Sequence, residues 1–147
     1  MTIDGLVSLL LTQDTSYLSS NGVPISGMVS TRLQPLPAPD DEAQYPCIVY
    51  QSASFVEEYS DSGPVGIAKE RVVFDCMAFA TGDQGGFGLS RSIAFAIRNA
   101  LAGFGPAALP DGTFVEDIQI VNIVGGWNDA ARTLYKTSVH AMVQYQI

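Results

Sequence analysis

The residue types that most often carry chemistry are few and scattered in this sequence. His140 is the only histidine, so one chain cannot build a histidine-based metal cluster, and no Cys-x-x-Cys pair replaces it. No Gly-x-Ser-x-Gly segment presents a nucleophile. Glu116 and Asp117 are adjacent on a predicted strand and point to opposite faces, so they make a poor carboxylate pair. The sequence predicts no catalytic residue, no metal site, no cofactor and no enzymatic activity.

One glycine-rich segment, Gly82–Gly88, could hold a ligand, because it follows a predicted strand and precedes a predicted helix. It lacks the Lys-Ser/Thr pair of a P-loop, Arg91 stands where a dinucleotide motif has glycine, and Asp83 would repel phosphate. A plain turn is the favoured interpretation. The alternative is a small cytoplasmic ligand-binding α+β domain or enzyme that uses this loop.

Composition bounds the class of protein. The 147 residues are 47% hydrophobic and 15% charged, which is typical of one globular domain spanning 1–147. The net charge of −8, with only seven scattered basic residues, argues against binding to a phosphate backbone. Leu6–Leu11 is apolar but too short to span a membrane. A hairpin that turns near Gly63 would place Cys47 and Cys76 on opposite faces, so reduced thiols and a cytoplasmic compartment are expected.

The predicted fold is organised around one strand that is followed by a helix. The strand alternates through Val72, Phe74, Cys76 and Ala78, and the turn Thr81–Gly88 ends it. The period then becomes helical from Leu89 and closes at Gly103, with an apolar face of Leu89, Ile93, Ala96, Ile97, Ala100 and Leu101.

The rest of the chain adds strands and one further helix to this unit, which predicts an α+β fold. Its sheet is expected to be mainly antiparallel, with about four long strands and two helices packed on one face. His140 falls on the polar face of the terminal strand, as a solvated or edge residue. The predicted elements are a helix at Thr2–Ser19, a Pro-rich extended arm at 23–45 with a short strand at Met28–Leu33, a strand at Pro46–Glu57, a protruding hairpin loop at Glu57–Ala68, a strand at Phe114–Val124, a turn at Gly125–Ala131 and a strand at Arg132–Ile147.

The central strand is apolar on its second face as well, where Val73, Met77 and Phe79 lie. A strand that is apolar on both faces must be covered on both. Because the sequence offers only two clear helices, these three residues are predicted to form a contact with another subunit.

Three segments carry a resemblance to a known family. They are Tyr45–Tyr50 (Tyr-Pro-Cys-Ile-Val-Tyr), Arg71–Ala78 (Arg-Val-Val-Phe-Asp-Cys-Met-Ala) and the helix end Asn99–Leu101. Together with the order of the elements over residues 3–147, this resembles the bacteriophage tail-completion proteins, also called tail-terminator or head–tail joining proteins. Gly82–Gly88 departs from the more helical segment expected there.

The resemblance implies a hexameric ring that caps the tail tube and binds the tail tube protein and the head/neck connector. Such a protein belongs to the tail or neck of the virion and is assembled in the host cytoplasm. DNA would pass through the lumen without specific binding, in keeping with the acidic charge, and no membrane is involved. The hairpin residues Glu57, Glu58, Tyr59 and Asp61 are expected to contact the next ring.

Overall fold

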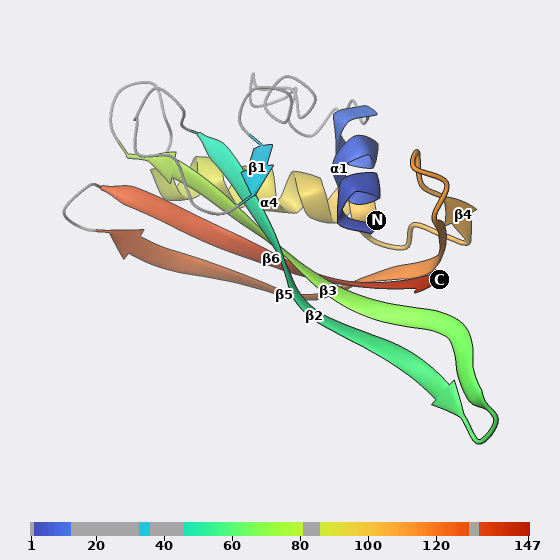
Figure 1. Ribbon diagram of the computed structural model, residues 1–147. Helices are drawn as coiled ribbons and strands as arrows, with labels where there is room; N and C mark the ends of the chain where they lie inside the picture. Colours follow the sequence, from blue (N-terminus) through green and yellow to red (C-terminus); the bar gives the residue numbers. More distant parts are fainter. Residues whose placement is uncertain (1, 13–32, 36–45, 81–85, 130–132) are drawn as a thin grey trace.

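Four long strands form the centre of this fold, as the sequence predicts. The structure, a computed structural model, describes residues 2–12, 33–35, 46–80, 86–129 and 133–147. Within these segments a six-stranded sheet has the order β1-β2-β3-β6-β5-β4, and both described helices lie on one face of it (Figure 1). The predicted α+β class is confirmed. The elements are α1 (Thr2–Thr12), β1 (Leu33–Pro35), β2 (Cys47–Ser60), β3 (Gly63–Phe79), α4 (Gly86–Leu101), β4 (Ala107–Ala108), β5 (Phe114–Asp129) and β6 (Leu134–Gln146).

The segment predicted as a loop at Glu57–Ala68 is instead paired strand almost to its tip. β2 and β3 pair antiparallel from Cys47↔Met77 out to Ser60↔Gly63, which leaves a two-residue turn. Gly63 has φ +119°, a conformation that side chains disfavour, and the Ser60 hydroxyl donates to its carbonyl at 3.3 Å. The glycines and proline of this segment are typical of a turn, but the hydrogen-bonded pairing of β2 with β3 continues along it. The hairpin extends well beyond the rest of the sheet (Figure 1).

The second helix begins earlier than its apolar periodicity indicates. α4 starts at Gly86 instead of Leu89, while 81–85 of the expected turn lie outside the described residues. The Ser90 hydroxyl lies 3.0 Å from the Thr137 hydroxyl, a buried hydrogen bond that links the helix to β6. The helix ends at Leu101, and Gly103 follows with φ +73°. The face buried on the sheet contains Ile93, Ala94, Ala96, Ile97 and Leu101.

The end of the chain also differs from the predicted boundaries. β5 continues to Asp129, so the glycine pair expected in a turn is strand, with a register shift between Val124 and Trp127. A β-bulge accommodates an extra residue in one strand, here at the two glycines, while the pairing with β6 continues on either side. β6 lies between β3 and β5, which makes His140 a residue of a central strand and not of an edge.

The cysteine prediction is confirmed. Cys47 pairs with Met77 and Cys76 pairs with Ile48, so the two side chains point to opposite faces and do not form a disulfide with each other. Burial, with smaller contributions from Asp75 and Cys47, raises the pKa of the Cys76 thiol well above its ordinary value.

The predicted first helix and arm are described only in part. α1 covers Thr2–Thr12, and β1 pairs parallel with β2 over three residues. The remaining parts of the predicted helix (13–19), of the short strand (28–32) and of the arm (23–32 and 36–45) lie outside the described residues. A Cβ atom on Gly5 would lie 2.8 Å from the Asp111 carboxylate, so α1 packs closely on the loop before β5. No helix in the described ranges is long and apolar enough to cross a membrane.

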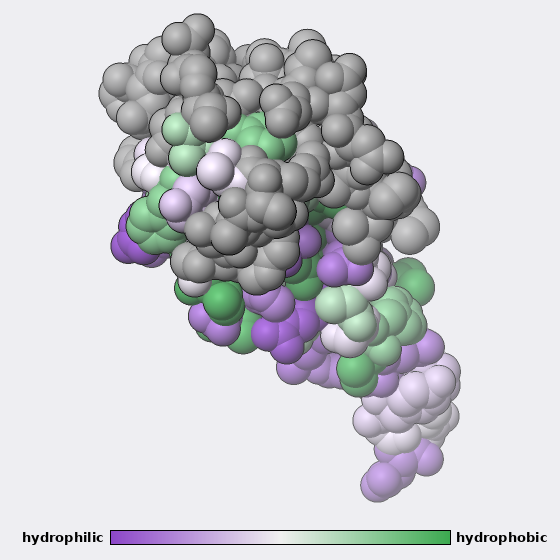
Figure 2. All heavy atoms as spheres, turned by 90° about the vertical axis from the view of Figure 1, so that its left-hand side faces the viewer, coloured by the Kyte–Doolittle hydropathy of each residue, from purple (hydrophilic) through white to green (hydrophobic). Residues whose placement is uncertain are grey.

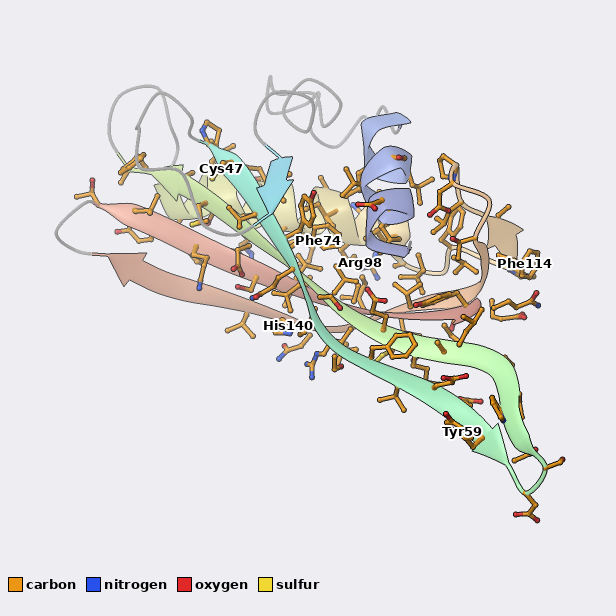
Figure 3. The ribbon with its side chains drawn as sticks, in the orientation of Figure 1. Cys47, Tyr59, Phe74, Arg98, Phe114 and His140 are labelled. Carbon is orange, nitrogen blue, oxygen red and sulfur yellow. The ribbon has the colours of Figure 1, made fainter. Side chains whose placement is uncertain are left out.

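The main core lies between the sheet and the two helices. Its largest fully buried side chains include Phe74 and Ile48 from the sheet, Leu6 and Leu10 from α1, and Ile97 from α4. Phe74 points toward the helices in Figure 3, whereas His140 lies on the opposite side of the sheet. The two sheet faces therefore have different environments.

Candidate functional site

His140 lies on the sheet face that faces away from the helices, in register with Val73 and Asn122. It is half-buried, and its Nδ1 atom is buried without a hydrogen-bond partner in the described part of the chain. Burial, and then the positive charge of Arg71, lower the pKa of the imidazole, while Asp75 opposes that change. Asp75 instead accepts a hydrogen bond from the Ser138 hydroxyl. Ser138 is only 9% exposed, so this hydroxyl is not presented to a substrate, and the bond is one that holds β3 and β6 together.

This environment predicts a pH dependence of stability. The unfolded chain binds a proton near the ordinary histidine pKa of 6.5, whereas folded His140 does so only at lower pH. The free energy of unfolding should therefore decrease as the pH falls through the range just below 6.5. Urea denaturation of the protein and of His140→Gln tests this. The difference between the two should be constant from pH 7 to 8 and change below 6.5, and a constant difference throughout would contradict the prediction.

The remaining candidate residues for chemistry are not brought together. Glu116 accepts a hydrogen bond from the Gln146 amide at 2.7 Å, and Asp117 accepts one from the Gln119 amide at 3.1 Å. The last three residues of the glycine-rich segment, 86–88, belong to α4, and 82–85 lie outside the described residues. No group of three His, Cys, Asp or Glu side chains that could hold a metal ion occurs within the described ranges.

Glu70 is a buried carboxylate near the base of the hairpin, with 4% of its surface exposed. Its Oε1 atom accepts a hydrogen bond from the Tyr145 hydroxyl at 3.0 Å. Its Oε2 atom is buried and has no hydrogen-bond partner among the described residues. Because Glu70 lies in register with Phe55 on one side and Val143 on the other, this bond links the base of the hairpin to β6.

The predicted contact residues of the hairpin lie where a partner can reach them. Tyr59 has 68% of its surface exposed and Asp61 is exposed at the tip, while Glu57 and Glu58 are half-buried. Glu58 forms a salt bridge with Lys69 at 3.1 Å across the hairpin. Figure 2 shows the hairpin emerging from the body of the molecule, and Figure 3 places Tyr59 near its end.

The structure adds apolar surface that sequence reasoning did not assign to the hairpin. Phe55 and Val56 are 53% and 58% exposed, and Val65 on the other arm is 45% exposed. The signal was present, because adjacent apolar residues on a strand point to opposite faces and only one face of this sheet carries helices. Exposed apolar side chains on a projecting element are typical of a surface that binds another protein.

Val73, Met77 and Phe79, the predicted subunit contact, lie on the face away from the helices. Their exposed fractions are 5%, 5% and 2%, and Met77 and Phe79 form a second small cluster with Cys47, Val49 and Leu134. In a single chain these side chains leave little surface for a partner. Their role in a subunit contact stays a prediction.

No protein-family model matches this chain, and no curated protein matches it. Sixteen chains of solved structures do match. One belongs to the structure described as the virion of a native gene transfer agent (GTA) particle. It is 14% identical to this chain, has a TM-score of 0.66, and the match covers 96% of this chain and 92% of that chain. At this level of identity the match shows a shared fold.

Proposed function

We propose that this chain is a structural virion protein and not an enzyme. It forms a ring, of six copies, at the head-proximal end of a phage-like tail. The ring caps the tail tube and joins it to the head/neck connector, and it is assembled in the host cytoplasm before it becomes part of the tail or neck.

One observation carries this proposal: the likeness to a chain of a gene transfer agent virion extends over nearly the whole of both chains. A full-length match indicates that the same complete domain is used, and not merely one shared hairpin. The sequence resemblance to tail-completion proteins points to the same class and adds the position in the particle. Fold alone does not define function, so the proposal also depends on the surfaces that this chain offers.

The projecting hairpin supports contact with a neighbouring ring. Four of the nine exposed large apolar side chains in the described part of the chain lie on its two arms. Tyr59 combines a large apolar ring with a polar hydroxyl, the kind of residue that is enriched where proteins bind each other. We assign Glu57, Glu58, Tyr59 and Asp61 to the contact with the tail tube or the connector.

The net charge of −8 supports a passage that does not retain DNA. Acidic side chains repel the phosphate backbone, and no counterion release is available to favour binding. DNA therefore passes through the lumen without specific recognition.

The native mass in solution tests the ring. Light scattering on a sizing column, at several concentrations, should give six times the chain mass of 15.6 kDa, about 94 kDa, at high concentration or in the presence of tail tubes. Electron microscopy of tail tubes mixed with the protein should show a ring at one end. A tight dimer that never forms a larger species and is stabilised by nucleotide would contradict the proposal and favour the ligand-binding alternative.

A variant of the hairpin tests the joining step separately. Tyr59→Asp replaces an exposed aromatic contact with a charge and should leave the ring mass unchanged while reducing the fraction of capped tubes at least tenfold, because central aromatic residues contribute about 2 kcal/mol or more to binding. Ser62→Asp in the adjacent turn is the control for added charge. Equal capping by both variants and by the natural protein would rule out a role for Tyr59.

A further inference from the structure

We propose that neighbouring copies in the assembly extend one another's sheets. The free edge of β2 in one copy pairs antiparallel with the free edge of β5 in the next. This inference rests on the proposed ring, because a ring of identical chains needs two different and complementary surfaces on each copy. Each edge leaves backbone N–H and C=O groups without a neighbouring strand among the described residues.

β2 forms the first free edge. β1 pairs with it only at Ile48, Val49 and Tyr50. From Gln51 to Ser60, ten residues of β2 have β3 on one side and no strand on the other within the described residues. Half of the backbone N–H and C=O groups of such a segment point outward, where another strand can bind them.

β5 forms the second free edge, at the opposite side of the sheet. β4 covers it only at Phe114 and Val115. The Gly103 amide donates to the Ile118 carbonyl at 3.0 Å, so the loop after α4 occupies the edge as far as Ile118. From Gln119 to Asp129, eleven residues have β6 on one side and no strand on the other in the described part of the chain.

The two edges match in length and in direction. The strands β2, β3, β6 and β5 alternate in direction because each neighbouring pair is antiparallel. β2 and β5 of one chain therefore run in opposite directions. A copy that is related by rotation about an axis inclined to the strands presents its β5 antiparallel to β2. Gln51 is level with Asn122 within one chain, so pairing with Asp129 needs a displacement of about six or seven residues along the strands, which this inclination provides. The alternation then continues unbroken from one copy to the next.

The side chains along the two edges are compatible in this direction. The proposed pairing uses Gln51 to Val56, with Gln51 near Asp129 and Val56 near Val124. It leaves Glu57, Glu58 and Tyr59 outside this contact, free for the next ring. Exposed apolar side chains occur on both edges, Phe55 and Val56 on one, and Val121 and Val124, each 50% exposed, on the other. The pairing would cover surface that is unfavourable in water.

Both edges lack two of the residue types that commonly prevent pairing. Gln51–Ser60 and Gln119–Asp129 contain no proline and no lysine. Each contains register shifts, between Ser52 and Ser54 on β2, and between Ile120 and Asn122 on β5. Bulges bend a strand and increase its twist, and a sheet that closes into a ring must be curved.

Cysteine cross-linking tests the pairing. Ser54 and Val124 are exposed and lie on the sheet face away from the helices, because they are in register with Arg71 and Ser138. In the proposed register Val124 lies opposite Val56 and is therefore the diagonal neighbour of Ser54, within reach of a short linker. The double variant Ser54→Cys with Val124→Cys, treated with a short bis-maleimide, should give a ladder of covalent oligomers on a denaturing gel. Each single variant should give less than a tenth of the cross-linked product, because a head-to-tail contact brings together two different sites. The buried Cys47 and Cys76 stay as they are, and the natural protein measures their background.

The control pair is Ser54→Cys with Asn99→Cys, whose second site is exposed on α4. Cross-linking of Ser54→Cys alone would indicate a symmetric β2–β2 contact and overturn the inference. A ring mass by light scattering with no ladder would also overturn it and leave the proposed function intact. A chain that stays monomeric at every concentration and with tail tubes would overturn both.

A charge placed on the edge gives an independent measurement. Val56→Lys puts a cation on the free edge, whereas Val65→Lys places it on the β3 arm of the same hairpin. The first variant should lower the fraction of protein in rings at least tenfold, and the second should not. Equal ring fractions in the two variants would contradict the pairing.

Discussion

Replacing Phe74 by alanine is expected to lower the free energy of unfolding by about 3–5 kcal/mol. The side chain is fully buried in the main core, on the central strand β3 and beneath the helices (Figure 3). Truncation removes apolar contacts and leaves a cavity that the surrounding sheet cannot fill, because strands on both sides hold β3 in place. Urea denaturation followed by circular dichroism measures the change.

Phe55→Ala is the matched control. Phe55 lies on the neighbouring strand and is 53% exposed, so the same truncation should cost less than about 1 kcal/mol. In assembly the order should be reversed. Phe55→Ala should lower the fraction of protein in rings more than Phe74→Ala does, because Phe55 lies on the free edge of β2. A loss of stability below 1 kcal/mol for Phe74→Ala would mean that the helices do not cover β3 as described.

Tyr145→Phe is expected to lower the free energy of unfolding by about 1–3 kcal/mol, the range for a buried acceptor that loses its donor. The substitution leaves the ring in place and removes only the donor that reaches Glu70 at 3.0 Å. Both oxygens of the buried Glu70 side chain are then without a hydrogen-bond donor among the described residues, and burial of an unpaired polar group is costly. Equilibrium unfolding in urea at pH 7 measures this loss.

Two further variants separate the causes. Glu70→Gln keeps an acceptor for the Tyr145 hydroxyl and should therefore cost less than Tyr145→Phe. Tyr59→Phe removes a hydroxyl from a residue that is 68% exposed and should change the stability by no more than about 0.5 kcal/mol. If Tyr145→Phe behaves like Tyr59→Phe, the buried bond contributes nothing to the stability of the hairpin base.

Much of the fold could be predicted because its elements are long and strongly patterned. The alternation around Phe74 and the helical spacing around Ile93 each extend over several repeats, so local side-chain periodicity alone defines the strand and the helix. The separation of Cys47 from Cys76 follows from counting residues on either side of a turn, and the pairs Cys47↔Met77 and Ile48↔Cys76 confirm it. Element ends were less accurate, because Gly86 and Gly125 lie in helix and strand although their type is typical of turns.

The candidate surfaces were only partly predictable. The exposed position of Tyr59 agrees with the predicted contact, but the exposure of Phe55 and Val56 depends on where the helices end over the sheet. The burial of Val73, Met77 and Phe79 within one chain likewise depends on packing between segments that are distant in sequence.

Residue types and local spacing are enough to predict the secondary-structure pattern, the opposite faces of the two thiols and the scarcity of groups for catalysis. The strand order, the central place of His140 in β6 and the two free edges of β2 and β5 become known only from the folded chain. Strand order depends on which segments of the chain pack against each other. The free energy that favours one order comes from burial between residues that are distant in sequence, and local periodicity contains no information about those contacts.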